Sequence, residues 1–258
     1  MSVNSYLQSL DSEIKVSDSE EERIETSVTT IKLRLSSYFG SDITERKVFG
    51  SYDRGTILSR KSDDDSDVDL MVVFKNPYGY KPQTFLNKLK DFAEHYYSLS
   101  EIHQSSPTIV LELNHIKFEL VPAYVSYGSY YIPDGPSNWK RTDPDKLKAN
   151  VNESNKNNGY KIKPVLRLLK HWNVNKNYGV IASYSLEDVV ATSLKYAYFT
   201  CTSYTDYLKK AFESIRTITT SSERVTTAIE RIDKALYYEA NDMPYSALGE
   251  IKKVFPEV

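Results

Sequence analysis

The sequence predicts an α+β protein of two lobes, with a mixed sheet in the first half and helices in the second. Two observations carry the first half: an apolar strand pattern over 70–74 follows a pair of acids, and 109–123 has the pattern of a hairpin turning at Asn114-His115. Beyond residue 140, apolar residues recur at helical spacing. We therefore expect one lobe over 1–140, including an N-terminal helix, and a helical lobe over 141–258.

The N-terminal helix is predicted by a capping box, in which Ser17 and Glu20 can each bond the other's backbone N–H. Apolar residues then recur at helical spacing until Gly40, which ends the helix. The other elements expected in this half are a strand near 47–50, the acid-bearing strand, a break at 77–82, a helix with an apolar stripe over 85–96, the hairpin, and a crossing to the second lobe at 130–136.

The second lobe should begin with a helix at Asp143-Pro144, where a cap residue precedes a proline in the first turn. Five further helices are predicted from their apolar spacing: 162–172, 186–199, 204–218, 222–239 and 245–254.

Composition favours a cytoplasmic enzyme of modest size. The 258 residues suffice for a packed core, and the net charge of -2 argues against stable nucleic-acid binding. One cysteine excludes an intrachain disulfide and a cysteine-based zinc site. Because no long apolar run follows the first methionine or occurs later, we expect neither secretion nor a membrane span.

The most informative motif is VFGSYDRGT at 48–56 followed by SDVDLMVVF at 66–74. Residues two apart in a strand share a face, so Asp67 and Asp69 should project side by side. Paired carboxylates suit Mg²⁺ or Mn²⁺, which share oxygen ligands with substrate phosphates. Gly50 and Ser51 offer backbone N–H groups and a hydroxyl for those phosphates. The acids at 63–65 are more simply a solvated loop, although a register using Asp63 and Asp65 remains an alternative.

This order of Gly-Ser, a spacer and Asp-x-Asp resembles the DNA polymerase β-like nucleotidyltransferase superfamily. The segment 117–123, KFELVPA, is similar to the third-acid strand of the cGAS/DncV-like nucleotidyltransferases (CD-NTases). The resemblance implies the polymerase β-like fold with the active site in a cleft between lobes, and makes Glu119 the third metal ligand or the general base. Most relatives carry Asp there, and an exposed surface acid is the alternative interpretation of Glu119.

Two stretches of the second lobe resemble nucleotide-binding segments of the same families. In RLLKHWN at 167–173, the resemblance assigns phosphate contact to Lys170, while the neighbouring Arg167 could equally belong to a solvated basic face. In ASYSLE at 182–187, it places the Ser183 hydroxyl on the phosphates and the Tyr184 ring on the base. A cap, by Ser183 or Ser185, and a packed tyrosine would give the same pattern.

The resemblance thus implies a catalytic lobe over 1–140 and a nucleotide-binding lobe over 141–258. It implies two metals about 3.5–4 Å apart that promote attack on an α-phosphate with loss of pyrophosphate. Nucleoside triphosphates would become a cyclic oligonucleotide signal in CBASS-type antiphage defence, read by a separate effector protein, with a protein activator possible. The alternatives are a toxin-like nucleotidyltransferase that modifies tRNA or a protein, and a non-catalytic nucleotide-binding module, which the intact acid pair disfavours.

Overall fold

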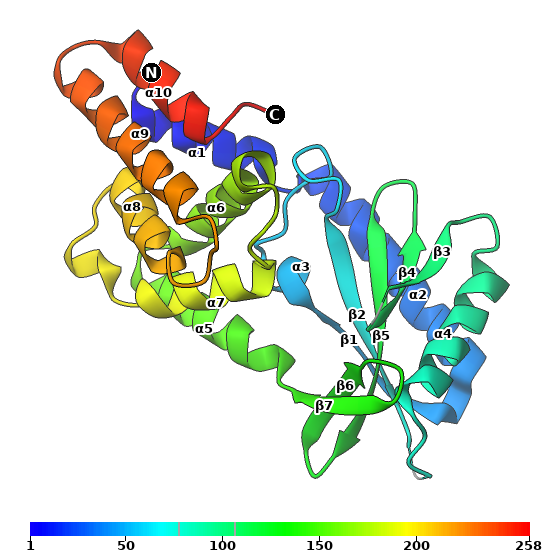
Figure 1. Cartoon of the computed structure of the whole chain (residues 1–258). Helices are drawn as coiled ribbons and strands as arrows, with labels where there is room; N and C mark the ends of the chain where they lie inside the picture. The colour runs from blue at the N-terminus through cyan, green and yellow to red at the C-terminus, as the bar shows by residue number, and fades with distance from the viewer. Residues whose placement is uncertain (77, 106) are drawn as a thin grey trace. The chain divides into compact units, whose positions relative to one another are not determined.

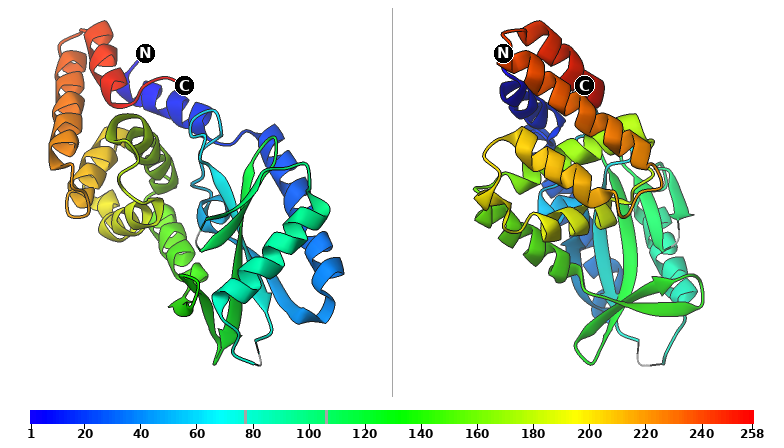
Figure 2. Two further views of the ribbon diagram at one scale, coloured as in Figure 1. Left: turned by 45° about the vertical axis from the view of Figure 1, so that its right-hand side comes forward. Right: turned by 60° about the vertical axis from the view of Figure 1, so that its left-hand side comes forward.

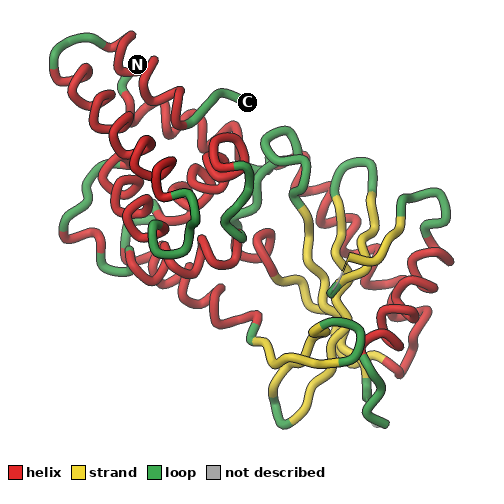
Figure 3. Tube along the Cα trace, viewed as in Figure 1, coloured by secondary structure: helices red, strands yellow, loops and turns green. Residues whose placement is uncertain are grey.

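A computed structural model describes residues 1–76, 78–105 and 107–258, so Pro77 of the expected break lies outside the described residues. The chain forms two compact units, and each is made of separate stretches of sequence. The mixed unit comprises Ser17–Asp53 and Asp65–Asp145, and the helical unit comprises Met1–Val16, Arg54–Asp64 and Lys146–Val258. Figure 1 follows the chain by colour, and Figure 3 distinguishes the strands from the helices.

The mixed unit is built on a sheet that, within the described residues, contains seven strands. Its elements are α2 (Asp18–Phe39), the 3₁₀ turn η1 (Gly40–Asp42), β1 (Ile43–Phe49), α3 (Gly50–Arg54), β2 (Asp67–Phe74), α4 (Pro82–Tyr96), β3 (Ile102–Ser105), β4 (Thr108–Glu112), β5 (Lys117–Ser126), β6 (Ser129–Asp134) and β7 (Asn138–Thr142). The main order is β1-β2-β5-β4-β3, and the β6–β7 hairpin pairs with the far end of β5. Only β2 and β5 run parallel among these pairs, which makes the sheet mixed.

Helices α2 and α4 contact each other and cover one face of this sheet, α2 against β1 and α4 against β3, β4 and β5 (Figure 2). Phe74 of β2 packs on this face, with its ring 4.8 Å from that of Phe85 and 5.0 Å from that of Phe39. Since side chains alternate along a strand, residues 68, 70, 72 and 74 lie under the helices, and Asp67 and Asp69 project from the opposite face.

The two helices begin for reasons visible in the sequence. The capping box at α2 forms as expected: Ser17 accepts from the Glu20 N–H, and Glu20 accepts from the Ser17 N–H. Gly40 ends the helix with φ at +51°. Helix α4 starts with Pro82 in its first turn, where the missing N–H costs no helical hydrogen bond.

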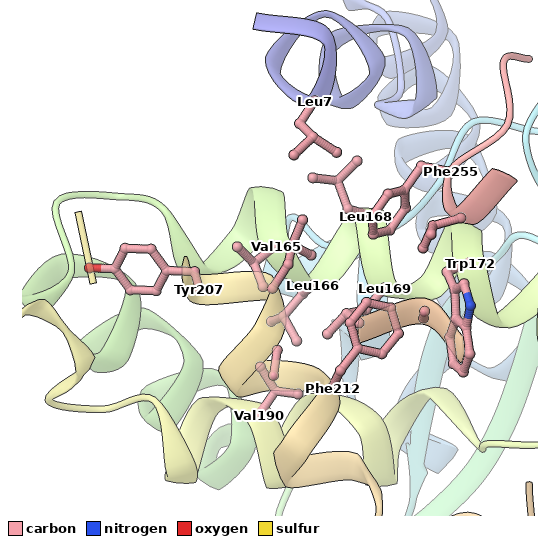
Figure 4. Packing of buried hydrophobic residues seen from close by; sticks show 14 of the residues in the cluster. Leu7, Val165, Leu166, Leu168, Leu169, Trp172, Val190, Tyr207, Phe212 and Phe255 are labelled. Atoms are coloured by element: carbon pink, nitrogen blue, oxygen red, sulfur yellow. The ribbon is translucent and has the colours of Figure 1, made fainter. Parts of the chain in front are cut away.

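The helical unit comprises α1 (Val3–Ile14), α5 (Pro144–Asn157), α6 (Ile162–Asn177), α7 (Ser183–Ser193), the 3₁₀ turn η2 (Ala197–Phe199), α8 (Tyr204–Ile215), α9 (Ser222–Ala240) and α10 (Pro244–Val254). Helix α6 forms its centre and buries most of its residues. Its apolar side chains pack against α1, α7 and α8, and Trp172 meets the Phe212 ring edge-to-face at 4.9 Å (Figure 4).

Helix α1 completes this core from the other end of the sequence. Val3, Leu7, Leu10 and Ile14 are fully or almost fully buried in it. Two polar contacts hold the helix in place: the Tyr6 hydroxyl donates to the Phe255 carbonyl at 2.7 Å, and the Val3 N–H donates to Glu239 at 2.7 Å.

The predicted fold class, α+β with a mixed sheet and a helical part, is confirmed. The hairpin at 109–123 and the helices after residue 140 also form, although α6 runs five residues further than expected and 186–199 divides into α7 and η2. The interpretation of 130–136 as a crossing is wrong, because these residues belong to the β6–β7 hairpin. Helices α1 and α3 and strand β3 were not predicted from the sequence.

The expected division at residue 140 lies close to the change of unit after Asp145. The first sixteen residues, however, group with the helical unit, as does the stretch Arg54–Asp64. The assignment of 1–140 and 141–258 as catalytic and nucleotide-binding lobes concerns function and stays a prediction.

Candidate active site

The three candidate acids lie on two neighbouring strands of the mixed unit. Strands β2 and β5 pair in parallel with Asp67 opposite Lys117 and Asp69 opposite Glu119. Paired residues of adjacent strands point to the same face, and their backbones lie about 4.8 Å apart. Asp67, Asp69 and Glu119 therefore project together from the face that α2 and α4 leave uncovered, with Lys117 as the basic member of the group.

Gly50 lies against the second of these acids. A Cβ built on Gly50 would stand 1.7 Å from Oδ2 of Asp69, far inside any allowed contact, and the φ of Gly50 is +74°. Phe49, the residue before it, pairs with Asp69 across β1 and β2. Both the space and the backbone conformation thus require glycine here, and the close approach brings the Asp69 carboxylate to the start of α3, where Ser51 follows.

Glu119 is half-buried, and burial raises the pKa of its carboxyl above the usual 4.5. Lys117, the Thr108 hydroxyl and His103 each lower that pKa and so offset part of the effect of burial. A carboxylate with a raised pKa is a stronger base. The shift is in the direction that favours a general base.

The donor chemistry of this face suits a hard divalent cation. Mg²⁺ binds through one or two carboxylates together with substrate phosphates and water, rather than through a complete set of protein ligands. Asp67 and Asp69 supply that minimum from one face. Among the described residues there is no group of three or more His, Cys, Asp or Glu gathered closely enough to hold a metal ion by themselves, so further ligands would have to come from substrate.

Lys170 lies in the helical unit, inside a buried ionic cluster. Its Nζ donates to the Thr56 carbonyl at 3.1 Å and to Oε1 of Glu187 at 3.3 Å, and the residue is 6% exposed. Oε2 of Glu187 accepts from Nε of Arg54 at 2.6 Å. The two cations lower the pKa of Glu187 despite its complete burial. An ammonium group carries three N–H donors, and the described residues accept from two of those of Lys170, which leaves a third donor.

Arg167, one helical turn earlier, is not part of a solvated face. It forms a two-pronged ion pair with Asp11 of α1, at 2.7 and 2.8 Å, and donates to the Gly55 carbonyl at 2.9 Å. Both partners of the pair are largely buried. The residue ties α6 to α1 and to the stretch after α3.

Ser183 and Tyr184 occupy the first turn of α7, and both are exposed, Tyr184 by 58%. The expectation that Ser183 or Ser185 caps the helix is wrong, because the N-cap is Ala182 and no side chain caps it. The first amides of a helix have no acceptor within the helix itself, and here no capping side chain supplies one. The turn therefore presents backbone donors, a hydroxyl and an aromatic ring together, as a nucleotide would require.

The sequence analysis missed Arg54 and Glu187, although both stand inside the motifs that it examined. The available signal was a glutamate followed by buried positions in an apolar helix, which needs a cationic partner. The identity of that partner, 133 residues away, could not be read from local pattern.

Comparison with known proteins agrees with this architecture. Residues 1–155 match the Second Messenger Oligonucleotide or Dinucleotide Synthetase (SMODS) domain. A "probable cyclic nucleotide synthase" of Bacillus cereus (strain VD146) is 29% identical over 189 residues, which cover 62% of this chain and 57% of that relative's length.

Two solved structures share the fold at low sequence identity. CdnC of E. coli MS115-1, in a complex with HORMA-deltaN, has a TM-score of 0.74 at 12% identity and covers 98% of both chains. The CdnE cyclic dinucleotide synthase of Elizabethkingia meningoseptica, with GTP and Apcpp, has a TM-score of 0.65 at 17% identity and covers 97% of this chain and 96% of its own.

The fold and the acid-bearing strands define a polymerase β-like nucleotidyltransferase architecture. The chain belongs to the SMODS family, within the CD-NTases. The resemblance inferred from the motifs is thereby confirmed. Within the described residues, no helix combines the length and apolar character needed to cross a membrane.

Proposed function

We propose that this protein joins nucleoside triphosphates into a cyclic oligonucleotide second messenger and releases pyrophosphate. The observation that carries the proposal is the register of β2 and β5, which sets Asp69 beside Glu119 and places both with Asp67 on one open face. The contact between Gly50 and the Asp69 carboxylate supports it, since it joins the acids to the Gly-Ser turn.

In the proposed reaction, a ribose hydroxyl oxygen forms a bond to the α-phosphorus of a second nucleotide. The bond from that phosphorus to the bridging oxygen breaks, and pyrophosphate leaves with its electrons. Glu119 takes the proton of the hydroxyl. Asp67 and Asp69 would hold Mg²⁺ or Mn²⁺, which when bound neutralises phosphate charge and lowers the pKa of the attacking hydroxyl.

For the donor nucleotide, we propose Ser51 and the backbone around Gly50 as phosphate contacts in the mixed unit. In the helical unit, Ser183 and the third donor of Lys170 would contact phosphate, and Tyr184 would stack on the base. Its exposed ring supports this role. Stacking on an aromatic is worth about 1–3 kcal/mol, so Tyr184→Ala should weaken nucleotide binding by about one to two powers of ten.

The biological setting is proposed from the family. A CBASS-type antiphage system would pair this synthase with a separate effector protein that reads the product. A protein activator is a further proposal, supported by the complex of CdnC with HORMA-deltaN. We propose a cytoplasmic location, where nucleoside triphosphates are plentiful.

The test is to incubate the purified protein with the four nucleoside triphosphates and Mg²⁺ or Mn²⁺, then treat the products with phosphatase. A ring has no terminal phosphate, so we expect a small phosphatase-resistant product, whose mass identifies bases and ring size. The double variant Asp67→Asn with Asp69→Asn should fold normally and make none.

Two results would count against the proposal. Near-normal turnover in the double variant would mean that the acids are misassigned. Transfer of radiolabel from a nucleotide to tRNA or protein, with no phosphatase-resistant product, would favour the toxin-like alternative.

A further inference from the structure

A pocket lies wholly within the helical unit, and none of the candidate active-site residues lines it. It is a cavity of about 290 Å³ between α6, α9 and α10. Its charged lining comes from Lys176 of α6, Arg224 and Arg231 of α9, and Lys253 of α10. No acid lines it within the described part of the chain. The volume is close to the lower limit for small-molecule sites.

The positive charge of this pocket, which we call the basic pocket, is only partly balanced by a neighbouring carboxylate. Glu250, with 8% of its side chain exposed, accepts from Arg231 at 2.6 Å and from Lys253 at 2.8 Å. Four cations against one carboxylate leave three positive charges in excess at a single concave site. The positive potential of this site attracts an anion, and Arg231, Lys253 and Lys176 remain accessible to one.

The aromatic wall of the basic pocket offers a further hydrogen-bond donor to a ligand. Trp172 is 2% exposed and lines the cavity, yet its indole N–H donates to no residue in the described part of the chain. In Figure 4 its nitrogen lies on the side of the ring away from Phe212. The nitrogen is not among the buried polar atoms that lack a partner, so it is accessible from the cavity and available to a ligand oxygen. By contrast, Trp139 in the mixed unit donates to the Tyr80 carbonyl at 3.1 Å.

We propose that the basic pocket binds a small phosphorylated molecule. Its phosphate oxygens accept from the indole N–H of Trp172 and from the guanidinium and ammonium groups of Arg224, Lys176 and their neighbours. Arginine suits this task because its planar fork matches phosphate oxygens. The guanidinium of Arg224 is already oriented by the Tyr178 ring, 4.5 Å away. The site is separate from the proposed active site and does not depend on turnover.

The test uses the two tryptophans of the chain as reporters. In ¹⁵N-labelled protein each gives one indole N–H resonance, and Trp139→Phe assigns them. Inorganic tripolyphosphate is titrated in the presence of EDTA, so that no metal-dependent binding at the acids contributes. We expect the Trp172 resonance to move downfield and saturate, while the Trp139 resonance stays in place.

Variants then locate the binding. Arg224→Gln should raise the Kd for tripolyphosphate about tenfold or more, the usual effect of losing a hydrogen bond between charged groups. Lys209→Gln is the matched control, since Lys209 lies on α8 outside the pocket and pairs with Asp233 at 2.5 Å. Its Kd should equal that of the wild type.

Three outcomes would overturn the proposal. The first is a Trp172 resonance that does not respond. The second is an equal Kd in the Arg224 and Lys209 variants, which would mean an adventitious ion only. The third is a response to RNA or to an acidic peptide but not to tripolyphosphate, which would make the basic pocket part of a macromolecular surface.

Discussion

Replacing Gly50 with alanine should damage the candidate active site through a single methyl group. The added Cβ would stand 1.7 Å from Oδ2 of Asp69, whereas real Cβ atoms almost never approach another heavy atom within 3.0 Å. The carboxylate or the turn must therefore move by at least about 1.3 Å. A displacement of about 1 Å at a catalytic group can reduce the rate about 100-fold, so we expect turnover to fall by about that factor.

Gly128→Ala is the matched control for this variant. Gly128 has φ at +73°, almost the same as the +74° of Gly50, but a Cβ there would meet nothing within 4 Å. Both substitutions carry the cost of positive φ, about 1 kcal/mol of folding free energy. Only Gly50→Ala adds the clash. The difference between the two variants therefore isolates the position of the Asp69 carboxylate.

The assay compares pyrophosphate release and thermal unfolding for the wild type and both variants. We expect Gly128→Ala to keep nearly normal turnover, and Gly50→Ala to lose it while remaining folded at the assay temperature. Mn²⁺ binding, followed by electron paramagnetic resonance with a non-hydrolysable nucleotide, should weaken only in Gly50→Ala. If the two variants agreed in turnover and Mn²⁺ binding within about threefold, the clash between residue 50 and Asp69 would not control the site.

Three further predictions concern carboxylates. Glu119→Gln keeps the shape of the side chain but removes its charge, so we expect nearly normal nucleotide binding and a turnover lower by about 10²-fold or more. The effect of Glu119→Asp should be milder. Unchanged turnover in the Gln variant would make Glu119 a surface acid. Glu187→Gln leaves Arg54 and Lys170 buried without a carboxylate, so the free energy of unfolding measured in urea should fall by about 3 kcal/mol. A loss below about 1 kcal/mol would mean that the buried ionic cluster does not stabilise the helical unit. The three cations around Glu250 lower its pKa from 4.5 to about 2. A depressed carboxyl pKa stabilises the fold above pH 4.5, and this contribution is lost as the pH falls to 2. The Tm of Glu250→Gln should therefore lie below that of the wild type at pH 7 and approach it near pH 2. A Tm difference independent of pH would exclude this linkage.

Features encoded in a few adjacent residues could be predicted from the sequence. The capping box of α2, the proline at the start of α4 and the period-two pattern around Asp67 and Asp69 each act within one turn or one strand. The relation of Gly50 to the acids was predicted only as an association of motifs. The close contact itself depends on the pairing of β1 with β2.

Features set by distant partners could not be predicted. Helix α1 has apolar residues at helical spacing, but its place in the core depends on helices near the other end of the chain. The segment 130–136 was predicted to be a crossing to the second lobe. Its Pro133 cannot donate to a ladder, yet it is tolerated in the β6–β7 hairpin outside the main strand order. The environment of Lys170 was equally hidden, because Thr56 and Glu187 reach it only in the folded unit.

The discontinuous make-up of the helical unit has a consequence for synthesis and for dissection of the protein. Its core requires α1 to wait for α8 and α10, which leave the ribosome much later. Contacts spanning some 250 residues form late and slowly. The chain loses the entropy of closing a long loop before these contacts can stabilise the fold. A fragment starting at residue 141 would lack the buried face of α1 and expose apolar helices to aggregation. Helical-unit fragments intended for binding studies should therefore carry residues 1–16 and 54–64 as well, joined by linkers in place of the two stretches of the mixed unit.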